Sequence, residues 1–124
     1  MPNKILITDD EPNIVKLVKV RLESNGYEVI TAASGTECIN KIVQEEPDLV
    51  ILDIMMPKMD GYDTLIAVKE MFAENEDEPP PVLIMTARAD SRIRDMLENE
   101  EVRGYIIKPF KAEELLAKIK EILA

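Results

Sequence analysis

The chain has 124 residues, with 25 acidic and 15 basic side chains, no histidine and a formal net charge of −10. A length of this order fits one domain with a buried core, and we therefore take residues 1–124 as a single domain. The acidic balance argues against direct binding to nucleic acids or anionic membranes, and the absence of histidine excludes histidine-based catalytic triads and zinc sites.

Cysteine content and hydropathy indicate a cytoplasmic protein in a reducing compartment. Cys38 is the only cysteine, so no disulfide can form within the chain, and core packing is its expected role. No apolar run approaches the roughly 20 residues that span a bilayer. The N-terminal residues run directly into a strand-like segment and leave no room for a secretion signal.

Five short runs rich in β-branched and aliphatic residues predict strands. In chain order they are Lys4–Thr8, Tyr27–Thr31, Leu49–Asp53, Val82–Thr86 and Tyr105–Lys108. Several of these runs are apolar throughout instead of alternating with polar residues. Continuous apolar runs are typical of strands that are covered on both faces, as in a parallel sheet.

A segment with helical spacing of apolar residues follows each predicted strand. The helices are expected to begin near Glu11-Pro12, at Ser34, near Tyr62, near Asp90 and near Ala112, and the last three to end near Ala73, Asn99 and Leu123. Ser34 and Glu37 have the spacing of a capping box. The residues expected on the inward faces of the first two helices are Ile14, Leu17, Val18, Arg21, Leu22, Ile39, Ile42 and Val43. Five strand-helix units predict an α/β fold with a parallel sheet between layers of helices.

Polar side chains close four of the predicted strands. Asp9 and Asp10 follow the first strand, Asp53 ends the third, Thr86 the fourth and Lys108 the fifth. The carboxyl ends of parallel strands meet at one edge of the sheet, where ligands bind in this class of fold. Three carboxylates at one edge repel one another unless a cation intervenes, and oxygen ligands suit Mg²⁺. A lysine and a threonine suit phosphate, so the sequence predicts phosphoryl chemistry.

Asp53 is the candidate phosphoryl acceptor, because it ends a very apolar strand and is the one acid of the three without an acidic neighbour. Lys108 and Mg²⁺ would neutralise charge on the transferring group. Each residue taken alone has a simpler structural explanation. Asp9 and Asp10 could cap the first helix, Asp53 could be a turn residue, and Thr86 and Lys108 could be ordinary strand ends. Their coincidence at one edge favours a site.

Four segments carry a resemblance to the receiver domain of two-component response regulators, the CheY-like family. They are residues 5–12, 47–57 with Asp60-Gly61, 85–87 and 105–110, and the resemblance covers nearly the whole chain. It implies a flavodoxin-like (βα)5 three-layer sandwich whose five parallel strands have the order 2-1-3-4-5. It also implies a cis peptide bond at Lys108-Pro109.

The same resemblance implies roles for the residues at the sheet edge. Asp53 would be the phosphoacceptor, and Mg²⁺ would be held by Asp9, Asp10, Asp53 and the main-chain carbonyl of Met55. Lys108 would contact the phosphoryl oxygens.

Further residues are assigned by the resemblance to the response that follows phosphorylation. Thr86 would be the switching hydroxyl, and Tyr105 the aromatic residue that moves with it and alters the surface of the fourth helix, fifth strand and fifth helix. Met55 and Arg88 occupy positions that tune the lifetime of the phosphoryl group in this family.

The function implied is a phosphorylation-activated signalling switch that assists its own phosphorylation and dephosphorylation and is not an enzyme toward other substrates. Its expected partners are a sensor histidine kinase or histidine phosphotransfer protein, and a downstream effector protein or output domain. We expect a monomer or weak dimer that acts as a stand-alone receiver, because Ala124 closes the last helix.

A stand-alone receiver has three alternatives. The first is the N-terminal receiver of a longer regulator with a DNA-binding or enzymatic output domain. The second is an aspartate-nucleophile phosphatase, which is disfavoured because such enzymes place a second aspartate where this chain has Met55. The third is a flavodoxin-like cofactor binder, which is disfavoured because the chain has no glycine-rich phosphate loop and no tryptophan.

Overall fold

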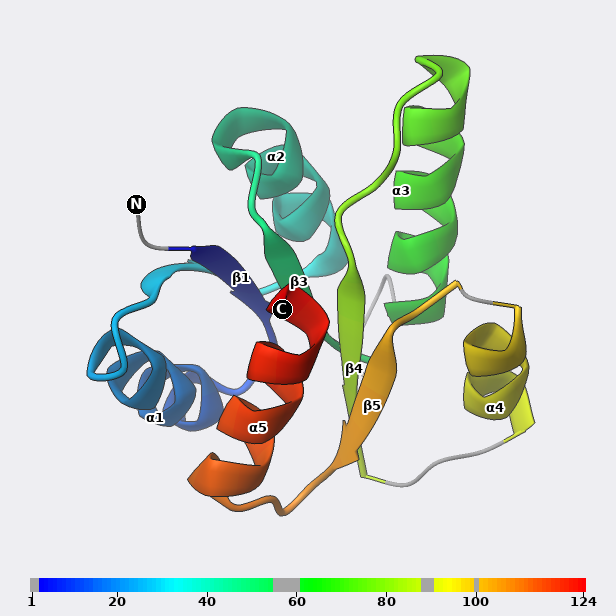
Figure 1. The fold of residues 1–124 in the computed structure, drawn as a ribbon. Helices are drawn as coiled ribbons and strands as arrows, with labels where there is room; N and C mark the ends of the chain where they lie inside the picture. Colours follow the sequence, from blue (N-terminus) through cyan, green and yellow to red (C-terminus); the bar gives the residue numbers. More distant parts are fainter. Residues whose placement is uncertain (1–2, 55–60, 88–90, 100) are drawn as a thin grey trace.

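The computed structural model describes residues 3–54, 61–87, 91–99 and 101–124, in which strands and helices alternate along the chain (Figure 1). The strands are β1 (Lys4–Thr8), β2 (Glu28–Ala32), β3 (Leu49–Asp53), β4 (Val82–Thr86) and β5 (Gly104–Ile107). The helices are α1 (Pro12–Glu23), α2 (Gly35–Glu45), α3 (Gly61–Glu74), α4 (Ser91–Glu98) and α5 (Ala112–Leu123). The five predicted strand-helix units are therefore confirmed, and β2 and β5 differ from their predicted ranges by one residue.

The described strands form one parallel sheet in the order β2-β1-β3-β4-β5, as the resemblance implied. β1 lies between β2 and β3, and Thr8 pairs with Leu52 near the carboxyl ends of β1 and β3. At the same edge Thr86, the last residue of β4, pairs with Ile107 of β5. Because of this register, the residues at the carboxyl ends of neighbouring strands lie side by side.

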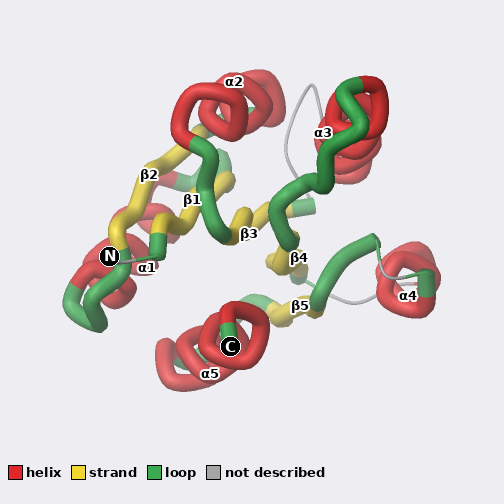
Figure 2. The backbone as a smooth tube through the Cα atoms, turned by 45° about the horizontal axis from the view of Figure 1, so that its top comes forward, coloured by secondary structure: helices red, strands yellow, loops and turns green. Residues whose placement is uncertain are grey.

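Helices cover both faces of the sheet, so the molecule has three layers (Figures 1 and 2). α1 and α5 pack on one face through a cluster of buried side chains that includes Val18, Leu22, Leu115 and Ile119. α2, α3 and α4 pack on the other face through a cluster that includes Ile42, Leu65 and Ile93. Successive residues of the central strands alternate between the two clusters, which is why their sequences are apolar throughout.

Two apolar residues predicted to face the sheet are instead exposed. Leu17 on α1 and Val43 on α2 are each 60% exposed. Arg21, placed on the same face as Leu17, is exposed as well. On α1 the buried residues are Val18 and Leu22, four positions apart. This single stripe fills the space above the sheet and turns neighbouring positions to solvent.

The start of α2 confirms the Ser34 half of the predicted capping box, whereas Glu37 bonds a different backbone N–H. Ser34 is the N-cap residue, and its side chain accepts a hydrogen bond from the Glu37 backbone N–H at 3.2 Å. The Glu37 side chain accepts a bond from the Ala33 backbone N–H at 3.3 Å, one residue before the cap. Cys38, in the same turn, is completely buried, which confirms its place in the core, and this burial raises the pKa of its thiol to about 11.

The end of α2 is formed by a residue in the left-handed conformation. Glu46 has φ 48°, and its backbone N–H donates to the carbonyl oxygen of Ile42 at 3.1 Å. Glycine adopts this conformation without the steric cost that an L side chain carries. We expect Glu46→Gly to raise the free energy of unfolding by about 0.5–1 kcal/mol, measured by urea denaturation. Gln44→Gly, inside the helix, should lower it by a similar amount, and the opposite order would contradict this account of the cap.

Candidate functional site

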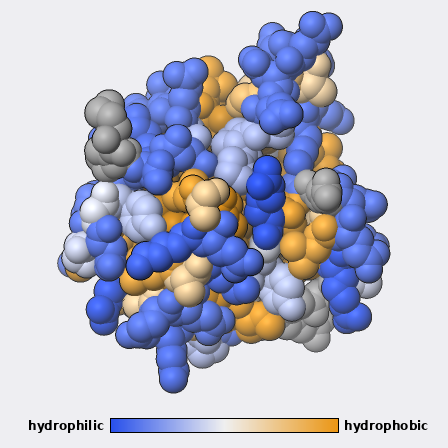
Figure 3. Space-filling model, viewed as in Figure 1, coloured by the Kyte–Doolittle hydropathy of each residue, from blue (hydrophilic) through white to orange (hydrophobic). Residues whose placement is uncertain are grey.

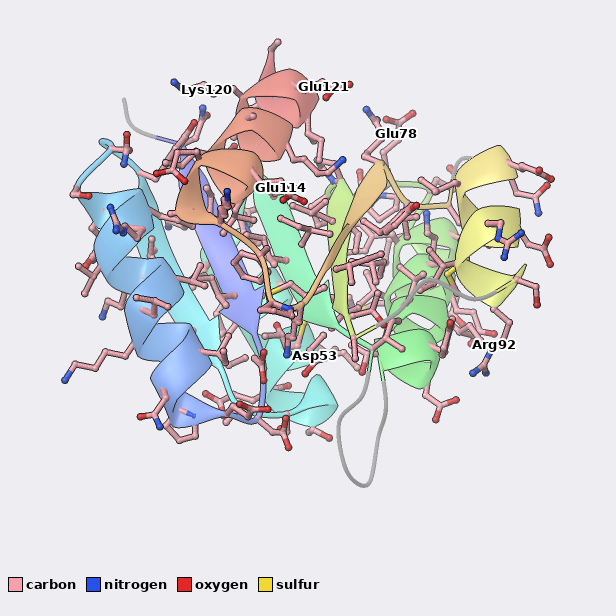
Figure 4. All side chains as sticks on the ribbon, turned by 90° about the horizontal axis from the view of Figure 1, so that it is seen from below. Asp53, Glu78, Arg92, Glu114, Lys120 and Glu121 are labelled. Atoms are coloured by element: carbon pink, nitrogen blue, oxygen red, sulfur yellow. The ribbon has the colours of Figure 1, made fainter. Side chains whose placement is uncertain are left out.

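Three carboxylates lie at the carboxyl edge of the sheet. Asp9 follows β1 and Asp53 ends β3, and these strands are direct neighbours. Asp9 is 1% exposed and Asp53 3% exposed, whereas Asp10 is exposed to solvent. One carboxylate oxygen from each of the three lies within 4.8 Å of the others. Figure 4 looks onto this edge, with Asp53 at the end of its strand. The structure thus brings together the three acids that the sequence singled out.

Lys108, after β5, reaches across β4 to Asp53 and across β4 and β3 to Asp9. Its Nζ donates to Asp9 Oδ2 at 2.7 Å and to Asp53 Oδ2 at 3.2 Å. Its backbone N–H donates to the carbonyl oxygen of Thr86 at 2.7 Å, which extends the pairing of β4 and β5 by one residue. The Lys108-Pro109 peptide bond is cis, as the resemblance implied. The predicted lysine is therefore in direct contact with two of the predicted carboxylates.

The Lys108 ammonium is stabilised in its charged form. Burial alone lowers the pKa of a lysine, but the hydrogen bond to Asp9 and the charges of Asp53 and Asp9 outweigh it, so the pKa of Lys108 is raised above 10.5. The side chain stays protonated at neutral pH. One ammonium beside three carboxylates leaves the cluster with an excess of negative charge.

The local chain geometry explains why Asp9 and Asp10 differ. Asp9 Oδ1 accepts a hydrogen bond from the Glu11 backbone N–H at 3.0 Å, which fixes the turn into α1. The N-cap position of α1 is Glu11, followed by Pro12, and no side chain caps the helix there. Across the described ranges, no hydrogen bond or ion pair of the Asp10 carboxylate is found. Neither aspartate is therefore a helix cap, which was the simpler explanation of this pair.

The donor set could hold a metal ion. Carboxylate oxygens are the ligands of hard divalent cations, and the excess negative charge at this edge favours a cation. Asp10 is open to solvent and so can be reached by a partly hydrated ion. Met55, predicted to contribute its carbonyl, and Arg88, predicted to tune the lifetime of the phosphoryl group, lie outside the described residues.

Thr86 and Tyr105 share one face of the sheet. Thr86 ends β4 and is 3% exposed. Thr86 pairs with Ile107 and Tyr105 with Ile84, so both lie at alternate positions on the side where α4 packs. Tyr105 is half-buried against the core cluster of that side. Thr86, at the end of β4, and Tyr105, on β5, therefore both lie on the face of the sheet that α4 covers.

Gly61 lies against the end of β3, and the sequence pattern predicts no role for it. Its backbone N–H donates to the carbonyl oxygen of Ile54 at 3.0 Å. A Cβ at this position would lie 2.5 Å from the carbonyl oxygen of Asp53 and 2.6 Å from the Ile54 Cα. Only glycine allows α3 to begin directly against the end of β3. The sequence signal for this glycine was its place in Asp60-Gly61, one of the segments that carry the family resemblance.

We expect Gly61→Ala to lower the free energy of unfolding by about 1–3 kcal/mol, because the backbone beside Asp53 must shift to admit a methyl group. Gly104→Ala is the matched control. A Cβ there would meet only Leu83 Cδ1, at 3.5 Å, which is an ordinary contact. Urea denaturation of both variants tests this. An unchanged free energy of unfolding in Gly61→Ala would show that the backbone beside Asp53 accommodates a methyl group without a shift.

Comparison with known proteins agrees with the fold. Residues 5–120 match the family model of the response regulator receiver domain. The chain is 41% identical over 122 residues to the probable transcriptional regulator ycf27 of Guillardia theta, covering 97% of this chain and 45% of that protein. It is 37% identical over 126 residues to the alkaline phosphatase synthesis transcriptional regulatory protein PhoP of Bacillus subtilis, covering 99% of this chain and 49% of that protein.

Solved structures show the same architecture over nearly the whole chain. The chemotaxis protein CheY4 of Vibrio cholerae superposes with a TM-score of 0.88 at 30% identity, covering 99% of this chain and 100% of that chain. A CheY-like receiver domain protein of Methanospirillum hungatei superposes with a TM-score of 0.86 at 32% identity, covering 99% and 94%. The chain belongs to the family of response regulator receiver domains. It spans a little under half the length of the two regulators above.

Within the part of the chain that the structure describes, no helix combines the length and the apolar composition needed to cross a bilayer.

Proposed function

We propose that the chain is a phosphorylation-activated switch of a two-component system, in which Asp53 accepts a phosphoryl group. The observation that carries this proposal is the bridge from Lys108 Nζ to Asp9 and Asp53, beside the exposed carboxylate of Asp10. The arrangement offers a carboxylate nucleophile, a cation for the phosphoryl oxygens and oxygen ligands for a metal at one edge. The expected donor is a phosphohistidine on a sensor histidine kinase or a histidine phosphotransfer protein.

In the proposed reaction, an Asp53 carboxylate oxygen attacks phosphorus and forms an acyl phosphate. The bond from phosphorus to the donor imidazole breaks, and the imidazole leaves with its electron pair. Lys108 moves from its bridge to the phosphoryl oxygens and neutralises their charge. Asp9, Asp10, Asp53 and the Met55 carbonyl would hold Mg²⁺, which supplies further neutralisation of the transferring group.

The response to phosphorylation is assigned to the face of the sheet that Thr86 and Tyr105 share. A phosphoryl group on Asp53 offers hydrogen-bond acceptors to the Thr86 hydroxyl at the end of the neighbouring strand. Movement of Thr86 frees space that Tyr105 can enter, which alters the surface formed by α4, β5 and α5. An effector protein or output domain would read this surface, and hydrolysis assisted by the same site would end the signal.

The names and lengths of the relatives are relevant to whether another domain is attached to residues 1–124. Two of them are named as transcriptional regulators, and the chain spans only 45% and 49% of their lengths. A DNA-binding output domain attached to residues 1–124 and a receiver that acts alone both stay proposals. The mass of the native protein distinguishes the two arrangements. The cytoplasmic location and the monomeric or weakly dimeric state stay predictions.

The proposed function is tested by incubating the protein with Mg²⁺ and a small acyl phosphate such as acetyl phosphate. Intact-mass spectrometry should show one added phosphoryl group on the wild type and none on Asp53→Asn. Removal of Mg²⁺ with EDTA should abolish the addition. Phosphorylation that survives in Asp53→Asn would refute Asp53 as the acceptor.

A further inference from the structure

A groove of about 430 Å³ lies between the C-terminal parts of α2 and α3. Its lining includes Ile42, Val43, Glu46, Phe72, Asp77 and Pro80, and we call it the α2–α3 groove. These residues come just before the first residues of β3 and β4, so the groove lies at the edge of the sheet opposite to Asp9, Asp10 and Asp53. It is separate from the site proposed to accept a phosphoryl group.

Both walls of the α2–α3 groove carry apolar side chains. Val43 is 60% exposed, and Phe72 and Met71 are half-buried. Figure 3 shows apolar surface beside the upper end of α2, toward α3, with hydrophilic side chains on both sides of it. The volume suits one or two large side chains of a peptide. An exposed apolar wall of this kind is stabilised when such side chains cover it.

The lining of the α2–α3 groove carries only negative charge. Glu46, Asp77 and Glu78 contribute carboxylates, and no lysine or arginine is among the described lining residues. Glu74, the last residue of α3, and Glu76, in the connection between α3 and β4, add acidic side chains nearby. Charge complementarity therefore requires a cationic occupant and disfavours nucleic acids and anionic membranes.

Hydrogen bonds to backbone carbonyl oxygens fix the shape of the α2–α3 groove. The Asp77 backbone N–H donates to the carbonyl oxygen of Phe72 at 2.9 Å, and Asn75 Nδ2 donates to the carbonyl oxygen of Met71 at 3.0 Å. On the other wall, the Glu46 backbone N–H holds the end of α2 through Ile42. A wall that is ordered before binding loses little conformational freedom when a ligand enters.

We propose that the α2–α3 groove binds a basic peptide segment of a partner protein. A leucine or phenylalanine of the segment enters the groove between Val43 and Phe72, and flanking lysine or arginine side chains pair with Glu46 and Asp77. The domain thereby binds a second partner, and this binding does not depend on Asp53. The groove recognises an apolar side chain of the partner that is flanked by positive charges.

The test is a titration of ¹⁵N-labelled full chain with the synthetic peptide KRLFRK, followed by NMR. The backbone amide signals of Val43, Phe72 and Asp77 should shift with a common dissociation constant. The peptide KRAARK, which keeps the charges but lacks the anchor, should bind about tenfold more weakly, and EDLFDE should not bind. In the Val43→Ser variant, the dissociation constants of KRLFRK and KRAARK should become nearly equal.

The charge requirement is tested with two double variants of equal net charge. Glu46→Lys with Asp77→Lys should weaken the binding of KRLFRK about tenfold, because two exposed ion pairs with the peptide become repulsive. Glu23→Lys with Glu121→Lys, at exposed positions outside the groove, should leave the dissociation constant unchanged. The proposal is overturned if both double variants weaken binding equally, if the shifts centre on Asp9 and Asp10, or if no signal shifts. Loss of phosphorylation in Asp53→Asn should leave this titration unaffected.

Discussion

Replacing Lys108 with methionine is expected to slow phosphorylation of Asp53 about 100-fold and to lower the free energy of unfolding by about 2–3 kcal/mol. The ammonium lies 2.7 Å from Asp9 Oδ2 and 3.2 Å from Asp53 Oδ2, and both aspartates are buried. Methionine fills a similar volume but leaves the two carboxylates facing each other without a counter-charge. The cost should fall below that of a completely buried pair, because the Lys108 side chain is 19% exposed.

The matched control for this variant is Lys111→Met. Lys111 is an exposed lysine at the same end of the sheet, at the N-cap position of α5, and its side chain makes no capping hydrogen bond. Urea denaturation and the time course of phosphorylation should both match the wild type in this control. If Lys108→Met were phosphorylated at the wild-type rate, Lys108 would serve the stability of the fold and not the transfer of the phosphoryl group.

The pH dependence of stability provides a second check on the same interaction. The pKa of Lys108 is raised in the folded protein, so its contribution to the free energy of unfolding is present in full below pH 10.5, the ordinary pKa of lysine. The contribution is lost as the pH rises from there through the raised pKa. The difference in stability between wild type and Lys108→Met should therefore be constant at neutral pH and shrink in strongly alkaline solution.

Replacing Asp10 with alanine is expected to weaken Mg²⁺ binding about 10- to 100-fold without destabilising the protein. Asp10 is exposed and has no hydrogen bond to the described residues, whereas Asp9 is held by Lys108 and by the Glu11 backbone N–H. Without Mg²⁺, removal of one of three neighbouring carboxylates relieves repulsion, so the free energy of unfolding should stay equal or rise slightly. An affinity that falls while stability does not is typical of a metal ligand and not of a structural residue.

Isothermal titration calorimetry with Mg²⁺ and urea denaturation in EDTA measure the two quantities. Glu11→Ala is the control, since Glu11 is an exposed acid next to Asp10 but is not part of the three-carboxylate cluster. It should retain most of the Mg²⁺ affinity. Equal loss in both variants would mean that the cluster attracts Mg²⁺ only through its overall charge, and unchanged affinity in Asp10→Ala would remove Asp10 from the metal site.

Much of the site could be predicted because a parallel sheet gathers the carboxyl ends of its strands at one edge. Once the apolar runs ending at Thr8, Asp53 and Thr86 were recognised as strands, the proximity of Asp9 and Asp53 followed from strand order. The strand order itself came from the resemblance and not from the pattern of apolar residues. The same is true of the cis bond at Lys108-Pro109.

Other features depend on details that no periodic pattern contains. Leu17 and Val43 have apolar side chains at helical spacing, yet the sheet has room for only one stripe of each helix, so both are exposed. Asp9 and Asp10 are adjacent and chemically identical, but only the three-dimensional path of the chain buries one and exposes the other. The requirement for glycine at Gly61 arises from a backbone approach across the end of β3.

The most direct test of the proposed function is to locate the phosphoryl group. After phosphorylation with acetyl phosphate and Mg²⁺, borohydride reduces an aspartyl phosphate to homoserine, and tandem mass spectrometry of the digested protein identifies the converted position. The account predicts homoserine at position 53 in the wild type. Conversion at position 9 or 10, or no conversion in a protein that is otherwise folded, would contradict it.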